Sequence, residues 1–124
     1  MKRIALVAAS LVAVFTCSDV AQAQATSSNE TVAFEAVDGF DRTSYGGVLD
    51  VTGVVRGDGA ASRLRLMTSY TDPEKVAGCE RMALLAMSRP GYYVLAVNQT
   101  VLRAADGTLA GRYLVSCGLS RTVP

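Results

Sequence analysis

The 124-residue chain contains no histidine and no tryptophan. Histidine is the commonest general base in enzymes, the usual partner of a serine or cysteine nucleophile and a frequent zinc ligand. Its absence therefore excludes most hydrolase designs. Carboxylates remain as possible acids and bases, and two pairs can be considered, Asp38 with Asp41 and Glu74 with Glu80. These positions are typical of turn residues and of a solvated helix face, so we predict that the protein is not an enzyme and holds no metal or cofactor.

The sequence also lacks an excess of charge of either sign, with 12 Lys and Arg residues against 11 Asp and Glu. Proteins that attract nucleic acid or anionic membranes in bulk carry a strong basic excess. We therefore expect no bulk attraction to nucleic acid. A long hydrophobic run is missing too: the most apolar stretch, residues 4–15, falls short of the ~20 residues of a spanning helix. We predict no membrane span.

The N-terminus has the three parts of a secretory signal peptide. Residues 1–3 are basic, residues 4–15 are apolar, and residues 21–23 form a small-x-small cleavage site. We predict cleavage near Ala23 and a periplasmic or secreted protein. Cys17 raises the alternative of a lipoprotein, in which a cysteine is acylated, but the bulky residues before it disfavour that pattern.

The remainder of the chain has the length of one domain. Residues 24–29 are small and polar and are predicted to be a flexible lead-in, followed by a single domain over residues 30–124. Cys79 and Cys117 stay in this part of the chain, and in an oxidising compartment they predict a disulfide bond. No C-x-x-C motif is present, so we expect this bond to be structural and not catalytic.

One segment, residues 72–88, is predicted to be a helix. Asp72 stands at the N-cap, Pro73 suits the first helical position, and Glu74 places negative charge at the positive end of the helix dipole. Pro90 cannot continue the hydrogen-bond ladder, and Gly91 can adopt a left-handed turn after the helix. Both ends of the helix are therefore specified.

Apolar residues at helical spacing predict the buried face of this helix: Val76, Cys79, Ala83 and Ala86 or Met87. Its second half, residues 82–87, is apolar nearly all round. Such a helix is usually covered on more than one side, so we expect cover from the sheet and from a loop or a second subunit. An oligomer is therefore possible.

Five segments with alternating polarity are predicted to be strands: residues 30–37, 47–56, 62–70, 92–103 and 109–119. Residues 38–47 are predicted to be a turn-rich loop, and Asp106 with Gly107 indicates a hairpin between the last two strands. Gly53 falls on the apolar face of the second strand, which suggests a bulge or a sharp coil.

The last strand is predicted to turn one face towards the helix, because Cys117 must reach Cys79. Strict alternation places Arg112 on the opposite face. The residues predicted to share the inner face are Leu109, Tyr113, Val115, Cys117 and Leu119.

The predicted order, β-β-β-α-β-β, resembles the OB-fold, a five-stranded barrel with a helix between the third and fourth strands. We therefore predict a β-rich α+β protein, in which a five-stranded antiparallel OB-like barrel carries one packed helix. The alternative is an open antiparallel sheet with one helix on a face. The barrel is favoured because closure removes exposed strand edges. The resemblance is one of element order alone, so it transfers no functional residues.

Candidate binding residues follow from this arrangement. Arg56, Arg63 and Arg65 are predicted to lie on the outer face of the hairpin between the second and third strands, a region with which OB-folds often bind oligonucleotides or oligosaccharides. Tyr45 in the first loop and Tyr93 at the start of the fourth strand are candidates for stacking on a ligand. A solvated arginine face and rim tyrosines without a ligand remain the alternatives.

These observations predict a small exported binding or interaction protein without catalytic activity. Its partner would be another protein or a polar ligand. A narrower version of this prediction is an inhibitor or immunity-type protein directed at an envelope or secreted enzyme. The alternatives are an oligosaccharide- or oligonucleotide-binding module, a structural envelope component that oligomerises through its helix, and an enzyme that depends on carboxylates.

Overall fold

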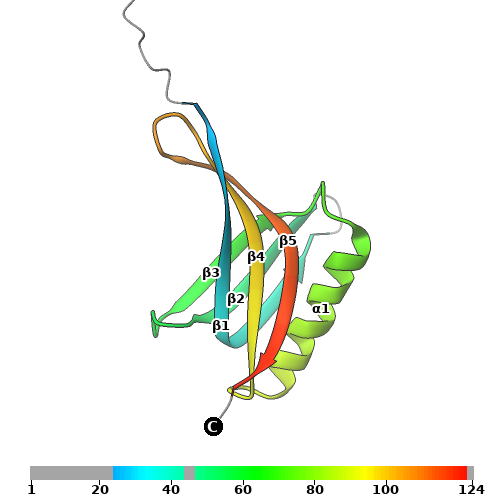
Figure 1. Ribbon diagram of the computed structural model, residues 1–124. Coiled ribbons are helices and arrows are strands. Elements are labelled where there is room, and N and C mark those ends of the chain that lie inside the picture. Colours follow the sequence, from blue (N-terminus) through cyan, green and yellow to red (C-terminus); the bar gives the residue numbers. More distant parts are fainter. Residues whose placement is uncertain (1–23, 44–46, 123–124) are drawn as a thin grey trace, which may run out of the picture.

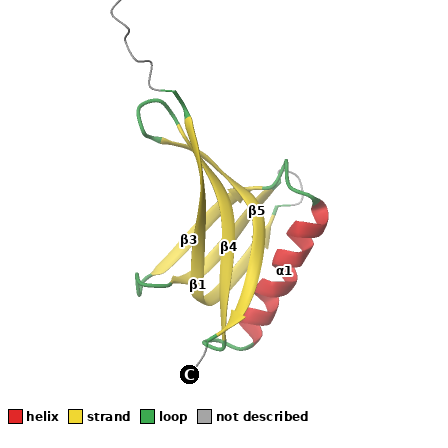
Figure 2. Ribbon diagram, in the orientation of Figure 1, coloured by secondary structure: helices red, strands yellow, loops and turns green. Residues whose placement is uncertain are grey.

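The computed structural model describes residues 24–43 and 47–122. The predicted signal peptide and its cleavage site, together with Cys17, lie outside the described residues. The elements follow in the order β1 (Thr26–Arg42), β2 (Val48–Val55), β3 (Ala61–Met67), α1 (Pro73–Ser88), β4 (Tyr93–Arg103) and β5 (Leu109–Arg121). Figures 1 and 2 show one helix packed beside a strongly curved sheet, so the predicted β-rich α+β class is confirmed.

The five strands close into one sheet in the order β1-β2-β3-β5-β4, with β4 returning to β1. The open-sheet alternative is therefore wrong. The prediction that all pairs are antiparallel is also wrong, because β3 and β5 run parallel and meet at one register pair, Met67 with Tyr113. β3 runs in the direction of β1 because both are antiparallel to β2, and β5 runs in the direction of β1 because both are antiparallel to β4. The closure is thus uneven, with long antiparallel ladders on one side and a short seam on the other.

β1 is longer than predicted at both ends. It begins at Thr26, which pairs with Arg103, so most of the predicted lead-in is strand. It also continues through residues 38–42, which were expected to be loop, and residues 39–42 pair with β2. The start of β1 and the β4–β5 hairpin extend together beyond the other strands (Figure 1). Cross-strand pairing overrides the turn preference of the small polar residues here.

Gly53 lies opposite an irregular part of the ladder, but the extra residues belong to β1 and not to the second strand, where the sequence suggested the bulge. The β1–β2 register shifts between Phe34 and Ala36 and again between Val37 and Gly39. A Cβ atom on Gly53 would collide with the carbonyl oxygen of Ala36. Glycine is therefore required because the two backbones approach too closely for any side chain.

The helix has the predicted ends, and the side chain of Asp72 accepts a hydrogen bond of 3.0 Å from the backbone N–H of Glu74. Its buried residues are Val76, Cys79, Ala83 and Ala86. They pack on a core that the strands supply: Phe34, Val37, Leu49, Val51, Leu64, Leu66, Leu95, Val97 and Leu114.

The outer side of α1 stays open. Leu84 and Leu85 remain 53% and 45% exposed, so within the described residues the apolar second half of the helix is covered on one side only. A covering second subunit stays a prediction.

Cys79 of α1 and Cys117 of β5 lie at disulfide-bonding distance, with their Cα atoms 5.1 Å apart, as predicted. This pairing is compatible with an oxidising, extracellular environment. Within the described part of the chain, no helix is both long and apolar enough to cross a membrane.

β5 does not alternate in the way the sequence predicted. Asn98 pairs with Ser116, and the next residue, Gln99, pairs with Leu114, so Val115 is an extra residue in a β-bulge. Leu114 is consequently buried, at 3% exposure, whereas Val115 is 38% exposed. The prediction that Tyr113 and Val115 share the inner face with Cys117 is therefore wrong.

Candidate functional site

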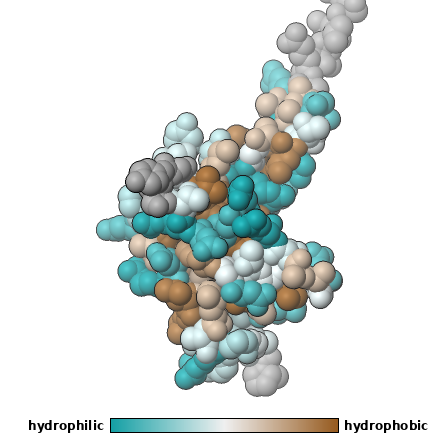
Figure 3. Space-filling view, turned by 180° about the vertical axis from the view of Figure 1, so that it is seen from behind, coloured by the Kyte–Doolittle hydropathy of each residue, from teal (hydrophilic) through white to brown (hydrophobic). Residues whose placement is uncertain are grey.

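A groove of about 380 Å³ opens where β3 and β5 separate. The two strands meet at Met67 and Tyr113 and diverge from this pair towards their N-terminal ends. We call this feature the arginine groove, and its lining consists of Val48, Arg63, Leu64, Arg65, Met67, Leu109, Gly111 and Arg112. Figure 3, which views the molecule from the side opposite to Figure 1, shows hydrophilic and hydrophobic residues lying next to one another across the middle of this face.

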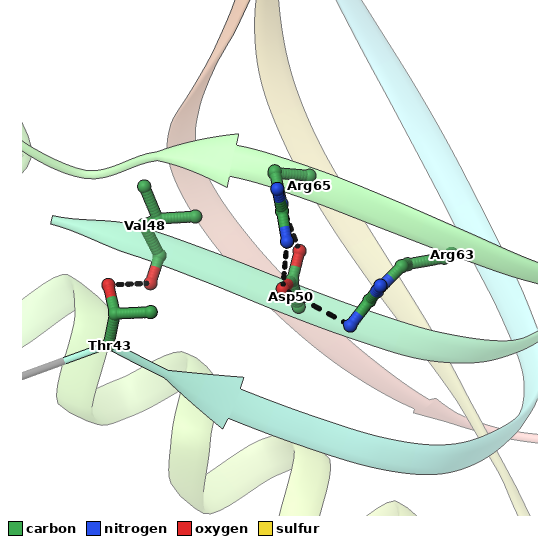
Figure 4. A network of polar contacts seen from close by, with 5 residues as sticks. All are labelled: Thr43, Val48, Asp50, Arg63 and Arg65. Carbon is green, nitrogen blue, oxygen red and sulfur yellow. Dashed lines mark hydrogen bonds and ion pairs between the residues drawn. The ribbon is translucent and has the colours of Figure 1, made fainter. Parts of the chain in front are cut away.

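The β2–β3 side of the groove contains an ion-pair network around Asp50. Arg65 stands directly opposite Asp50 in the ladder, and Nε and Nη2 of Arg65 donate to the two carboxylate oxygens over 2.9 and 3.0 Å. Nη2 of Arg63 lies 3.6 Å from the same carboxylate. Figure 4 shows both arginines converging on Asp50 from the neighbouring strand. The fork of Arg65 therefore binds the carboxylate in a bidentate way, which fixes both side chains.

Asp50 is only 6% exposed although it lies on the outer face of β2. The hydrogen bonds from Arg65 lower the pKa of this carboxyl below its ordinary value of 3.8, against the raising effect of burial, and the charges of Arg65 and Arg63 act in the same direction. Asp50 is thus ionised at neutral pH. It neutralises one of the groove's positive charges.

The β5 side of the groove contributes Arg112. Its Nη1 donates to Oε1 of Gln99 over 3.3 Å, and Gln99 carries no charge. Within the described residues, the ion pairs join Asp50 to Arg65, Asp50 to Arg63, and Glu30 to Arg103, and Arg112 belongs to none of them. The groove therefore keeps positive charge, because its three arginines face a single carboxylate.

Apolar side chains complete the groove. Met67 and Leu109 are 42% and 50% exposed, and they flank the arginines from β3 and β5. A groove with both arginine donors and exposed apolar surface favours a ligand with an anionic or polar group next to an apolar one.

The structure brings only part of the predicted binding set together. Arg63 and Arg65 lie side by side as expected, but Arg56 lies in the β2–β3 turn. The ladder partner of Arg63 is Thr52, four residues before Arg56, which corresponds to roughly 13 Å of strand. Arg56 is not part of the groove lining.

The predicted tyrosines do not line the groove either. Tyr45 lies outside the described residues. Tyr93 is half-buried against the core, and its ring meets the ring of Tyr92 edge to face, with centroids 4.7 Å apart. Tyr92 in turn contacts the guanidinium groups of Arg89 and Arg121, at 5.4 and 5.5 Å from its ring centre.

The carboxylate pairs considered from the sequence occupy ordinary positions. Asp38 and Asp41 are exposed on β1, while Glu74 and Glu80 lie in different turns of α1. In the described ranges, no cluster of three or more His, Cys, Asp or Glu residues could hold a metal ion. None of these carboxylates lines the arginine groove.

Sequence reasoning missed two residues of this region, Gln99 and Arg112. Strict alternation placed Arg112 on the opposite face of β5, and the bulge at Val115 reverses that assignment. No glycine or proline marks the bulge, so the sequence carries no local signal for it. Gln99 could have been noticed as the one polar residue in the row Leu95, Val97, Gln99 and Val101.

Comparisons with known proteins give no relative from which a role could be transferred. Neither a scan against protein-family models, nor a search of curated proteins, nor a search of solved structures found a match to this chain.

Proposed function

We propose that this protein is a small exported binding protein of the OB type, without catalytic activity, whose ligand occupies the arginine groove. The strand order β1-β2-β3-β5-β4, with the helix inserted between β3 and β4, supports the OB assignment. OB-folds often bind their ligands on the face formed by the second and third strands, and the groove borders that face, since β3 forms one of its sides and β5 the other.

The observation that carries this proposal is the groove's combination of charge and apolar surface. Arg63 and Arg65 are held in place by Asp50, so little side-chain freedom is lost when a ligand binds. Met67 and Leu109 offer apolar contact beside them. A partner protein could insert a loop that carries both groups, as expected for an inhibitor or immunity-type protein, and a small polar ligand could carry them as well.

A cross-linked pull-down tests this function. The oxidised protein serves as bait in an envelope extract of the source organism, and mass spectrometry reads the captured molecules. The R63E variant places a negative charge in the groove, whereas the R56E variant makes the same change in the exposed β2–β3 turn. We expect a partner that wild type and R56E retain and that R63E loses. A partner that R63E still captures as well as wild type would contradict a role for the groove.

A further inference from the structure

Gln99 is buried in an apolar row of β4. It follows Leu95 and Val97 at strand spacing and precedes Val101, and all three neighbours are fully buried. Gln99 itself is 1% exposed. A polar side chain in such a position destabilises the fold unless all of its hydrogen-bonding groups find partners.

Only one end of the Gln99 amide has a partner. Its Oε1 accepts a hydrogen bond from Nη1 of Arg112, while its Nε2 has no acceptor among the described residues. Rotating the amide by half a turn would place two donors against each other, because guanidinium groups only donate. The orientation is therefore fixed by Arg112, and Nε2 is left as a buried donor that lacks an acceptor.

The same contact connects this donor with the groove. Arg112 lines the arginine groove and reaches Gln99 because the bulge at Val115 turns both to one side of the sheet. Nε2 lies at most ~6 Å from Nη1 of Arg112, since amide bond lengths fix its distance from Oε1. Nε2 itself is buried and Gln99 is not part of the groove lining, so Arg112 is the group through which a ligand in the groove acts on Gln99.

The chemistry of this pair selects an anionic oxygen. Arg112 has no carboxylate partner among the described ion pairs, so a carboxylate bound in the groove would be neutralised there. Leu109 and Met67 supply apolar surface in the same groove.

We propose, building on the function proposed above, that Arg112, held in position by Gln99 in the core behind it, binds a carboxylate carried on an apolar group in the arginine groove. A C-terminal leucine of a peptide and a small organic acid both offer this chemistry. Binding neutralises the guanidinium of Arg112, which has no ion-pair partner among the described residues. Gln99 thus acts as a positioning residue for Arg112, at a cost in stability.

A carboxylate of the chain itself is the competing occupant. Glu30 stands opposite Gln99 in the β1–β4 ladder, although its Oε1 lies 3.9 Å from Arg103 and accepts from Ser28. If Glu30 paired with Arg112 in solution, the E30Q variant would shift the Arg112 side-chain signals without any ligand, and this result would overturn the proposal.

Side-chain amide signals of the oxidised protein provide the direct test. The chain has three glutamines and two asparagines, so the ¹H–¹⁵N signals of Gln99 can be assigned by comparison with the Q99L variant. The probes are N-acetyl-leucine and a leucine-ended hexapeptide, each compared with its C-terminal amide. We expect both carboxylates to shift the Gln99 and Arg112 side-chain signals and the amides to have no effect. If only one of the two carboxylates shifts these signals, the proposal still holds, and the size of the responding probe indicates the size of the natural ligand.

Two variants separate binding from folding. Q99L removes the unpaired donor, so we expect an unchanged or higher melting temperature together with at least tenfold weaker carboxylate binding. R112Q should weaken binding to a similar degree, whereas R56Q serves as the matched control outside the groove. If Q99L fails to fold, the wild-type amide shifts decide the question alone.

The outcomes distinguish this inference from the proposed function. Shifts of groove backbone signals without any change at the Gln99 amide would overturn the inference and leave the groove as a binding site. Equal affinity of Q99L and wild type would do the same. If no groove signal responds to either carboxylate, this ligand chemistry is wrong, and the pull-down with R63E tests the groove independently.

Discussion

The side of the sheet beneath α1 and the side at the arginine groove are filled in opposite ways. Beneath the helix the contact is apolar, and Cys79, Ala83 and Ala86 are each at most 3% exposed. At the groove, β3 and β5 share one register pair, and the groove's arginines are bonded to two buried polar residues, Asp50 and Gln99. Apolar burial stabilises the first region, whereas polar groups in the second stabilise the fold only where they are paired.

The same two strands, β4 and β5, supply both regions. Val97 pairs with Cys117 near the helix, and Gln99 with Leu114 two residues further on. The bulge at Val115 lies between these pairs and lets Cys117 and Arg112 face the same side of the sheet. Because of this one extra residue, the same hairpin supplies Cys117 to the disulfide-linked core and Arg112 to the arginine groove. The comparison predicts that stability and binding can be changed separately.

The largest loss of stability is expected from removing the disulfide. Cys79 and Cys117 are separated by 38 residues, and closing a loop of this length stabilises the fold by about 4 kcal/mol in the chain-entropy model. The variant with both C79A and C117A should therefore lose about this much free energy of unfolding in guanidinium titrations. Reduced wild type is the control and should behave alike. A loss below about 1 kcal/mol would show that the helix side does not depend on the covalent link.

A smaller loss is expected where β1 and β2 approach most closely. The G53A variant places a methyl group against the carbonyl of Ala36, so the strands must shift, and the free energy of unfolding should fall by more than about 1 kcal/mol. The matched control is G118A in β5, because a Cβ at Gly118 meets no atom within 4 Å. Equal stability of the two variants in thermal melts would contradict the close approach at Gly53.

The elements of this fold could be predicted because their signals are local. Asp72 and Pro73 fix the start of α1, and the alternation of residues 62–70 marks β3, although this strand ends at Met67. The spacing of Cys79 from the other buried helix residues indicated which helix face meets the sheet. Each signal depends on chain geometry within a few residues.

The remainder could not be predicted because it depends on partners distant in sequence. Residues 26–29 have the small, polar composition of a flexible leader, and only their pairing with β4 shows that they form a strand. The parallel seam at Met67 arises from how the sheet closes, and the bulge at Val115 has no sequence marker. The groove was therefore only half predicted, with Arg63 and Arg65 identified and Arg112 assigned to the wrong face.

The ion pair between Asp50 and Arg65 should contribute to the free energy of unfolding in a pH-dependent way. Arg65 lowers the pKa of Asp50 in the folded state, so the stabilisation is complete above the unfolded value of 3.8 and is lost as the pH falls through the folded value. D50N should cost about 1 kcal/mol at pH 7. Thermal melts from pH 7 to about 2 should show wild type and D50N converging below about pH 4. D58N, in the exposed β2–β3 turn, is the control. A difference that stays constant with pH would contradict the role of the charge.

The smallest effect is a gain of stability on the helix side. Gly78 lies inside α1, and a Cβ there would meet no atom within 4 Å, so G78A should raise the free energy of unfolding by about 0.5–1 kcal/mol through helix propensity. Thermal melts measure the gain, and carboxylate titration of the same variant should show unchanged binding. Q99L is also expected to keep or raise stability, but with a loss of binding. If G78A weakened carboxylate binding as Q99L is expected to do, the gain in stability itself would impair the site. This result would contradict the prediction that stability and binding can be changed separately.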